Sequence, residues 1–404
     1  MDSLAATSFA HVTYEDALQS AIGLIPLLRE HASEGELERH MPAAVAAALH
    51  RSGLIRALQP KRWGGMELKL SDWVGVLDKL GQGDCSVAWN VANLTLHHRT
   101  LALFDAQAQR EVWGQNPDAM IAAGIAYVQG RARRVDGGLV ISGTWNFCSG
   151  VVGAQWNMLA CVLKEDDKPV DWVQCILRDN EYQIIDDWNT MGMRGTSSCS
   201  VKVDELFVPE YRLQSMATAL PGHVFKGASE NTNPMFRMPT TAYGGHTPAA
   251  CIVGAAQGGV DMMVDWVRSR STSYTGARMR DFAMVQWRIG LASAKVDTAR
   301  LLLRNDCLEG EARMAMEKTV GETFDNEYKL RVKRNGAVAV RMAVEAVDLL
   351  HEMAGANGIY DTAPLQKIFR DVHAASAHIH FNMDVQMTQW GLVKLGGEFK
   401  SPTF

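Results

Sequence analysis

Two aromatic rings, a thiol and a hydroxyl follow one another near the end of a predicted strand. Residues 142–150 read Ser-Gly-Thr-Trp-Asn-Phe-Cys-Ser-Gly, and an Asp-Gly-Gly turn leads into the strand before them. Aromatic side chains exclude water, and a hydroxyl in such a dry environment supplies a directed hydrogen bond. The segment therefore predicts one wall of a binding site, with Ser149 as its polar group. Cys148 lies on the opposite face by the two-residue period of a strand and is expected to be structural.

A second segment joins glycine, a cation and small hydroxyl residues. Residues 191–198 read Met-Gly-Met-Arg-Gly-Thr-Ser-Ser, and a predicted strand at 199–203 follows them. Arg194 with the Gly195–Thr196 turn presents a positive charge and backbone N–H groups to a ligand. The alternative is that Arg194 forms a salt bridge that only fixes the turn.

Histidines supply the candidate acid–base groups. His97 and His98 follow Trp89 on one predicted helix, and His378 and His380 lie on another. Because residues two apart on a helix do not share a face, the second pair is a poor metal site, and only one of its rings is expected to point into a pocket. The alternative for each histidine is a packing role with its ring N–H satisfied.

Other chemistries lack their sequence signals. The run at 195–198 is not the G-x-S-x-G elbow of a hydrolase. No G-x-G-x-x-G follows a strand and no Walker loop occurs, so we expect no nicotinamide-binding domain. The seven cysteines are scattered without zinc spacing, which predicts no metal site and a reduced, cytoplasmic protein.

Composition narrows the class of protein. The hydrophobic fraction is 47%, the charged fraction 21% and the net charge −5, as in ordinary globular proteins without a basic surface for nucleic acid or anionic lipid. No apolar run is long enough for a membrane span. The first residues lack the basic and apolar regions of a secretion signal.

The elements that must position these residues change character twice along the chain. Residues 1–118 are predicted to be helical, and residues 119–214 to form a compact antiparallel β domain of short strands between Gly, Asp and Asn turns. Residues 215–245 are rich in Pro, Gly, Asn and Thr, and a loop of this length is predicted to cover the substrate. Residues 246–404 are predicted to form a four-helix bundle, with helices at 249–270, 279–307, 311–354 and 364–395.

The two loop segments and the order helix, β domain, bundle resemble the acyl-CoA dehydrogenase superfamily over nearly the whole chain. The resemblance implies the acyl-CoA dehydrogenase fold, which is mainly α with a central β domain. Residues 122–132 lack the Thr-Glu-Pro and Gly-Ser-Asp motifs of the dehydrogenases. With the segment at 142–150 they look instead like aromatic hydroxylase components. The chain thus resembles the two-component, reduced-flavin-dependent monooxygenases, a branch that oxidises phenols, indoles and dibenzothiophene.

The C-terminal part differs from the dehydrogenases at the catalytic position. It carries a dehydrogenase-like signature, but Ile379 stands where most dehydrogenases have their catalytic Glu; the signature residues are Asn357, Gly358, Pro364, Lys367, Phe369, Arg370 and Asp371. An aliphatic side chain cannot take a proton from a thioester α-carbon. A flavin-dependent acyl-CoA-type dehydrogenase with a displaced base is the alternative among enzymes. A binding or assembly protein that lost the chemistry is the alternative outside them.

The resemblance also implies a role for each candidate residue. Ser149 meets flavin N5, and Trp145 and Phe147 form flavin walls. His378 acts as a base or as a hydrogen-bond partner of the flavin peroxide, and His97 contacts the substrate. Further flavin-binding positions are Cys148, Arg194, Gly195, Thr196 and Arg278, the last in a degraded R-x-x-F-G segment that binds the FAD pyrophosphate across a subunit interface.

The implied activity is that of an oxygenase component. Reduced FMN or FAD, supplied by a separate flavin reductase, reacts with O2 to a C4a-hydroperoxyflavin, which hydroxylates an aromatic or heteroaromatic small molecule of phenol or indole type. Sulfoxidation and N-oxidation stay open as alternatives. In this family the helical bundles pack as a dimer of dimers, so a homotetramer is expected.

Overall fold

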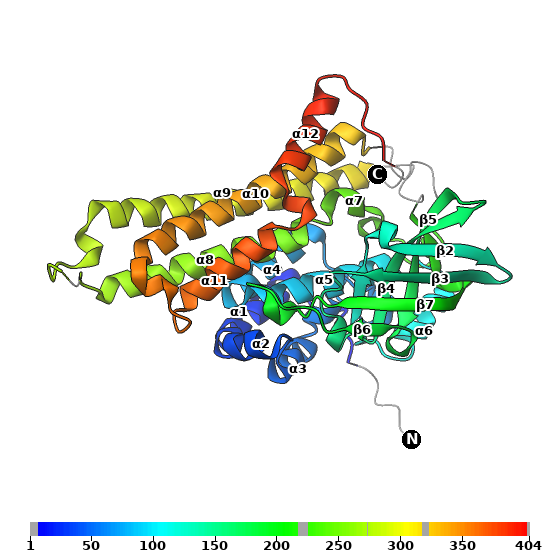
Figure 1. Cartoon of the computed structure of the whole chain (residues 1–404), viewed down its shortest axis with the longest axis horizontal. Helices are drawn as coiled ribbons and strands as arrows, with labels where there is room; N and C mark the ends of the chain where they lie inside the picture. The colour runs from blue at the N-terminus through cyan, green and yellow to red at the C-terminus, as the bar shows by residue number, and fades with distance from the viewer. Residues whose placement is uncertain (1–6, 217–224, 273, 317–322, 402–404) are drawn as a thin grey trace.

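A β domain stands at one end of the molecule, and a long helical bundle extends away from it above a layer of N-terminal helices (Figure 1). This computed structural model describes residues 7–216, 225–272, 274–316 and 323–401. The predicted order of a helical part, a β domain and a helical bundle is confirmed.

Among the N-terminal helices, α5 lies at the junction with the β domain and the bundle. Its residues Cys85–Leu101 are buried on nearly every side, and the Asp84 side chain caps it by accepting the N–H of Val87 at 2.8 Å. Its burial allows it to carry side chains to both other parts of the molecule. The other N-terminal helices are α1 (Tyr14–Glu30), α2 (Ala32–Glu38), α3 (Ala43–Ser52), α4 (Leu70–Gly83) and α6 (Ala106–Trp113). Of these, α4 packs along α5 and also along α1.

The β domain is one sheet with the order β6-β7-β3-β2-β4-β5-β8, with β1 beside β4. Most neighbours are antiparallel, as predicted, but β1 and β2 both run parallel to β4, so the sheet is mixed. Parallel pairs need long connections, and both strands reach β4 through such connections instead of a tight hairpin. The strands are β1 (Ile121–Gly124), β2 (Gly130–Val135), β3 (Gly138–Trp145), β4 (Trp156–Glu165), β5 (Lys168–Arg178), β6 (Gln183–Ile185), β7 (Ser200–Pro209) and β8 (Leu213–Ser215).

The bundle consists of long helices whose ends differ from the predicted ones. The second helix runs on past its predicted end, and the last predicted helix is broken into two by a 3₁₀ turn, η12 (Ile379–Phe381). The break occurs because the Asn382 side chain accepts the N–H of Val385 at 3.0 Å and starts a new helix. The helices are α8 (His246–Ser269), α9 (Ala283–Met316), α10 (Asn326–Ala354), α11 (Pro364–Ser376) and α12 (Met383–Lys394).

The predicted substrate loop, 215–245, lies partly outside the described residues, at 217–224. From residue 225 onwards it packs against the C-terminal end of α5 and contains η9 (Pro234–Arg237) and α7 (Thr240–Tyr243). The buried Arg99 guanidinium donates to the carbonyl of Met235 at 2.9 Å and to that of Met238. This part of the segment is therefore built into the fold next to α5.

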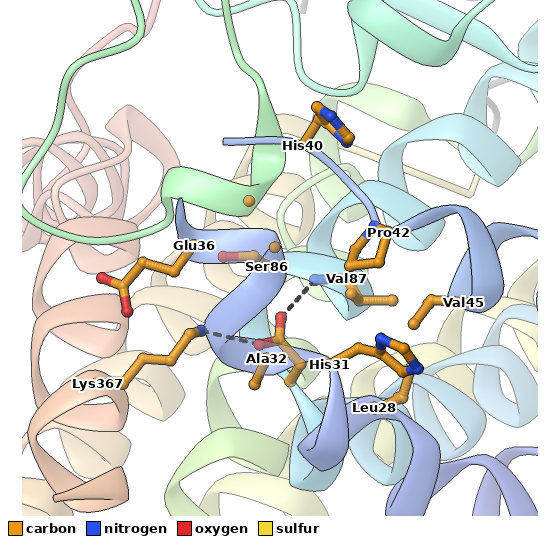
Figure 2. Close-up of a pocket in the computed structure, with 13 residues that line it drawn as sticks. Leu28, His31, Ala32, Glu36, His40, Pro42, Val45, Ser86, Val87 and Lys367 are labelled. Atoms are coloured by element: carbon orange, nitrogen blue, oxygen red, sulfur yellow. Dashed lines mark hydrogen bonds and ion pairs between the residues drawn. The ribbon is translucent and has the colours of Figure 1, made fainter. Parts of the chain in front are cut away.

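One buried ammonium joins the three parts of the molecule. Lys367 Nζ on α11 lies 2.8 Å from Asp84 Oδ2, before α5, and 2.6 Å from Asp371 Oδ2. Asp371 Oδ1 in turn accepts the N–H of Met193, in the second loop of the β domain, at 2.6 Å. Figure 2 shows Lys367 extending across a small pocket toward the start of α5, where Val87 lies. We call Lys367, Asp84 and Asp371 the charge hub.

The charge hub keeps its lysine ionised. Burial lowers the pKa of the Lys367 ammonium, but the carboxylates of Asp371 and Asp84 outweigh this and raise it above its usual value. Burial likewise raises the pKa of Asp371, against the attraction of Lys367. The hub is therefore stable only while all three partners are present.

We expect Lys367→Met to lower the free energy of unfolding by about 3–5 kcal/mol at neutral pH, because it leaves two buried carboxylates without a cation. Without the cation the folded state binds protons on these carboxyls more tightly than the unfolded chain does. The difference in the free energy of unfolding between Lys367→Met and the wild type should therefore shrink as the pH falls from about 8 to about 5. Urea denaturation at both pH values measures it.

Lys394→Met is the matched control for this substitution. Lys394 pairs with Glu327 at 2.7 Å on the surface, where the two side chains are 56% and 47% exposed. Its loss should change the stability by no more than about 1 kcal/mol at either pH. Equal effects of the two substitutions would contradict the role of the hub.

Candidate active site

The candidate site forms where α5 passes two loops of the β domain. Trp89 on α5 donates from Nε1 to Ser149 Oγ at 3.1 Å. Its ring meets the His378 ring edge-on, with centroids 5.6 Å apart, and the Phe381 ring at 6.5 Å. Two residues predicted from distant segments, Ser149 and His378, are thus brought together by one indole.

Strained backbone shapes both loops. Phe147, Met193 and Ser197 have φ of 66°, 56° and 42°, in the left-handed region that is unfavourable for residues other than glycine. The loops run side by side, since the N–H of Gly150 donates to the Thr196 carbonyl at 2.8 Å. Strain of this kind persists where surrounding contacts impose it, and it clusters at functional sites.

Three hydroxyl groups connect the loops behind Trp89. Ser149 Oγ lies 2.8 Å from Ser198 Oγ, which lies 2.7 Å from Thr196 Oγ1. Thr196 donates its proton to the Met193 carbonyl at 2.7 Å. We call Ser149, Ser198 and Thr196 the hydroxyl chain. Ser198 and Thr196 are buried, whereas Ser149 is partly exposed at the site.

The sequence predicts His378 within a helix, and this prediction is wrong. His378 lies at the start of the 3₁₀ turn η12. Its Nδ1 accepts the backbone N–H of His380 at 3.3 Å, which leaves the proton of the neutral ring on Nε2. Burial lowers its pKa to about 4, so the ring is neutral at physiological pH. His378 is therefore a neutral hydrogen-bond donor at Nε2.

His380 lies close to His378 but has different neighbours. The ring centroids of His378 and His380 are 5.0 Å apart. In a helix, residues two apart would point to different faces, but here a 3₁₀ turn replaces the helix and brings the rings together. The His380 Cβ lies 3.1 Å from where a Cβ on Gly245 would stand. Burial lowers its pKa to about 3, with the positive charge of Lys333 and the His246 ring acting in the same direction. It faces the bundle, whereas His378 faces α5.

The two histidines of α5 differ in burial and in hydrogen bonding. His98 is buried, and its Nδ1 accepts the N–H of Trp113 at 2.9 Å, so it packs the core. His97 is partly exposed, and its Nδ1 lies 2.6 Å from the Ile121 carbonyl. A carbonyl only accepts, so Nδ1 carries the proton and Nε2 is an acceptor. Burial lowers the pKa of His97 to about 4.

The three residues of the first segment occupy different environments. Trp145 is 0% exposed and donates from Nε1 to the Ala160 carbonyl at 2.7 Å. It fills the core of the β domain, which corrects its expected place as a flavin wall: it can only support the site from behind. Cys148 is buried in the same core. The Phe147 ring is 67% exposed and meets Trp188 edge-on with centroids 6.1 Å apart, so it remains available to a ligand.

Arg194 fixes the second loop through carbonyl groups. Its guanidinium donates to the carbonyls of Glu36 at 3.2 Å and Thr190 at 3.1 Å. Its charge thus secures the turn through hydrogen bonds in place of the alternative salt bridge. Gly195 lies against α5, because a Cβ there would stand 3.2 Å from Ser86 Cβ. Arg278 lies shortly before α9 and pairs with Asp281 at 2.8 Å. Figure 1 shows the start of α9 at the end of the bundle that is far from the β domain.

Sequence reasoning missed the residues that join the site. No motif in the sequence singles out Ser198, Phe381 or Trp188, and Trp89 marks only the helix that carries His97. The spacing of Trp89, Asn93 and His97 at successive helical turns is the signal that places an indole on the same face as His97. No local pattern indicates that Ser198 contacts Ser149.

Within the ranges 7–216, 225–272, 274–316 and 323–401, no group of three or more His, Cys, Asp or Glu side chains is arranged to hold a metal ion. No helix in these ranges is long and apolar enough to cross a membrane.

Comparison with known families places both helical parts of the chain. Residues 26–116 match the acyl-CoA dehydrogenase N-terminal domain, and residues 246–383 match the acyl-CoA dehydrogenase C-terminal domain. The fold predicted from the sequence is thereby confirmed.

Similar proteins of known activity cover almost the whole chain. The flavin-dependent monooxygenase oxygenase subunit HsaA of Rhodococcus jostii is 32% identical over 95% of this chain and 98% of its own. The FADH(2)-dependent resorcinol hydroxylase oxygenase component of a Rhizobium species is 32% identical over 94% and 93%. The crystal structure of 3-HSA hydroxylase from Rhodococcus sp. RHA1 superposes with a TM-score of 0.89 at 31% identity, covering 96% of this chain and 99% of that one. The chain therefore belongs to the oxygenase subunits of the flavin-dependent monooxygenases, a family with the acyl-CoA dehydrogenase fold.

Proposed function

We propose that this protein hydroxylates a phenol-type aromatic compound at the site around Trp89. Reduced flavin supplies two electrons, so that the aromatic compound and O2 give the hydroxylated product and water while the flavin is oxidised. The observation that carries the proposal is the meeting of Ser149, Trp89 and His378 between three separate parts of the fold.

The site suits a reduced flavin. The N5 atom of a reduced flavin bears a hydrogen, and the partly exposed Ser149 Oγ can accept a hydrogen bond from this N–H. The exposed ring of Phe147 offers apolar surface to a planar heterocycle, and the buried rings of Trp89 and Phe381 pack behind it. The neutral, half-buried His378 adds no charge to these surroundings. A dry and uncharged pocket protects a reactive oxygen species from water.

The two site histidines suit complementary roles. His378, with its proton on Nε2, donates a hydrogen bond to oxygen held in the pocket. His97, with a free lone pair on Nε2, accepts a hydrogen bond from a substrate hydroxyl. A phenol offers such a hydroxyl, and the relative from Rhizobium is named for a phenolic substrate, resorcinol.

An acyl-CoA-type dehydrogenation is the weaker alternative. Ile379, at the position of the usual catalytic carboxylate, is 61% exposed and aliphatic. His378 accepts a backbone N–H at Nδ1 and is a proton donor at Nε2, which is the wrong state for a base. The relatives that cover nearly the whole chain are monooxygenases.

The electrons must come from a partner. Since the chain shows no nicotinamide-binding motif, we propose that a separate reductase delivers reduced flavin by diffusion. FAD is favoured over FMN, because the resorcinol hydroxylase component that is 32% identical is named FADH(2)-dependent. All seven cysteines are free and buried, in keeping with a cytoplasmic location.

We expect His378→Ala to bind reduced flavin with nearly wild-type affinity while product formation falls roughly 10²–10³-fold, the effect of losing one preorganised hydrogen-bond donor. Without the Nε2 donor, the reactive oxygen is released as H2O2, so O2 consumption continues uncoupled from hydroxylation. Product, O2 and H2O2 measured in one reaction test this. His380→Ala is the matched control and should remain largely coupled, because its ring faces the bundle. Identical behaviour of the two variants would disprove the assignment.

We expect the purified protein alone to leave NADH unoxidised, and to hydroxylate a phenol when an unrelated flavin reductase, NADH and FAD are added. Physical contact with the reductase is unnecessary, so a dialysis membrane between the two proteins that passes FAD should preserve some product formation. Steady NADH oxidation by the isolated protein would contradict the two-component scheme.

We also expect a homotetramer, because α9 leaves a stripe of large apolar side chains uncovered. Trp287, Leu301 and Leu308 lie 14 and 7 residues apart, in one heptad register, and are 55%, 69% and 47% exposed, which is costly for an isolated chain. Light scattering at micromolar concentration should give the tetramer mass, and Leu301→Lys should lower it. A surface substitution outside the stripe, Lys168→Glu, should leave it unchanged. A monomeric wild type would refute the assembly.

A further inference from the structure

The protons of the hydroxyl chain are assigned from the one group at its end that can only accept. Thr196 Oγ1 lies 2.7 Å from the Met193 carbonyl, which can only accept, so the single hydroxyl proton of Thr196 points there. Toward Ser198 the Thr196 oxygen must therefore accept, and Ser198 donates. The proton of Ser198 is then used, so Ser149 donates to Ser198 across 2.8 Å.

The groups at the two ends of the hydroxyl chain agree with this direction of the hydrogen bonds. The Met193 carbonyl also accepts the indole N–H of Trp188 at 3.0 Å, which holds the terminal acceptor in place. At the near end, the indole N–H of Trp89 donates to Ser149 Oγ at 3.1 Å. Ser149 thus donates its only hydroxyl hydrogen to Ser198, and one lone pair of its oxygen remains free to accept a hydrogen bond from a ligand.

We infer that the hydroxyl chain makes Ser149 a pure acceptor, and that this selects the reduced form of the flavin over the oxidised form. The inference rests on the proposed contact between Ser149 and flavin N5. In reduced flavin N5 carries a proton and donates, which matches the free lone pair. In oxidised flavin N5 has only a lone pair, so two acceptors would face each other, and a buried polar contact without a proton is unfavourable. The same chain thereby favours release of the oxidised flavin.

Residues that never touch the flavin should therefore control the ratio of its two affinities. Ser198→Ala removes the acceptor of the Ser149 proton, which can then rotate and donate to N5 of oxidised flavin. Thr196→Val frees the Ser198 proton to turn toward Ser149, with the same consequence. Ser198→Thr keeps a hydroxyl at the position and should keep the wild-type preference.

The test is equilibrium dialysis of the full-length protein with oxidised FAD in air and with dithionite-reduced FAD under nitrogen. Wild type should bind reduced FAD more tightly. In Ser198→Ala and Thr196→Val the affinity for oxidised FAD should rise roughly two- to tenfold, the effect of one hydrogen bond, with little change for reduced FAD. Ser200→Ala is the matched control: its buried hydroxyl binds Asp187 at 2.5 Å, outside the chain, and the ratio should stay as in wild type. Circular dichroism and thermal melting verify that each variant is folded.

The outcomes separate this inference from the proposal beneath it. If Ser149→Ala abolishes the preference for reduced FAD but Ser198→Ala and Thr196→Val retain it, Ser149 is the N5 partner and the role of the hydroxyl chain is wrong. If wild type and Ser149→Ala bind both forms of FAD alike, the proposed contact itself fails, and the inference with it.

Discussion

The buried ammonium of Lys367 is the interaction on which the geometry of the site depends. It binds the carboxylate that caps α5 and the carboxylate that holds the N–H of Met193. These two contacts place the helix that carries Trp89 and the loop that carries Thr196 and Ser198, while α11 itself leads into η12 and His378. A buried charge tolerates no loss of a partner. None of the three elements can shift alone without leaving a charge uncompensated, so the site is held rigid from behind.

Full charges lie in this hub and on Arg194, whereas the residues proposed to contact a ligand carry none. Trp89, Ser149 and His378 offer one ring, one acceptor and one donor, and burial keeps His378 and His97 uncharged. Such a surface distinguishes ligands by the direction of hydrogen bonds and not by charge. For a reaction that passes a reactive oxygen species to a neutral aromatic ring, a dry and uncharged lining prevents side reactions with water.

The sequence predicts the features that local patterns determine. The order of the three parts, Ser149 in the loop that follows β3 and the Gly195–Thr196 turn all follow from contiguous residues. The break at 377–382 was missed, because the apolar helical period continues across it while the cap by Asn382 and the turn at His378 override it. Trp145 was placed at the ligand face, but its indole N–H finds the Ala160 carbonyl inside the sheet. The contacts of Trp89 join segments far apart in the chain, and only the fold shows them.

Strain explains why the hydroxyl chain needs both loops together. Met193 and Ser197 adopt left-handed conformations that cost of order 1–3 kcal/mol each, and they bring the Ser198 hydroxyl toward Ser149 and the Met193 carbonyl toward Thr196. The cost is offset by the contacts of Met193 with Asp371 and Trp188, hence by the charge hub. A serine at position 149 alone would keep a hydroxyl at the site with a freely rotating proton. It is the strained second loop, held by the hub, that fixes the proton and so turns an ordinary hydroxyl into an acceptor.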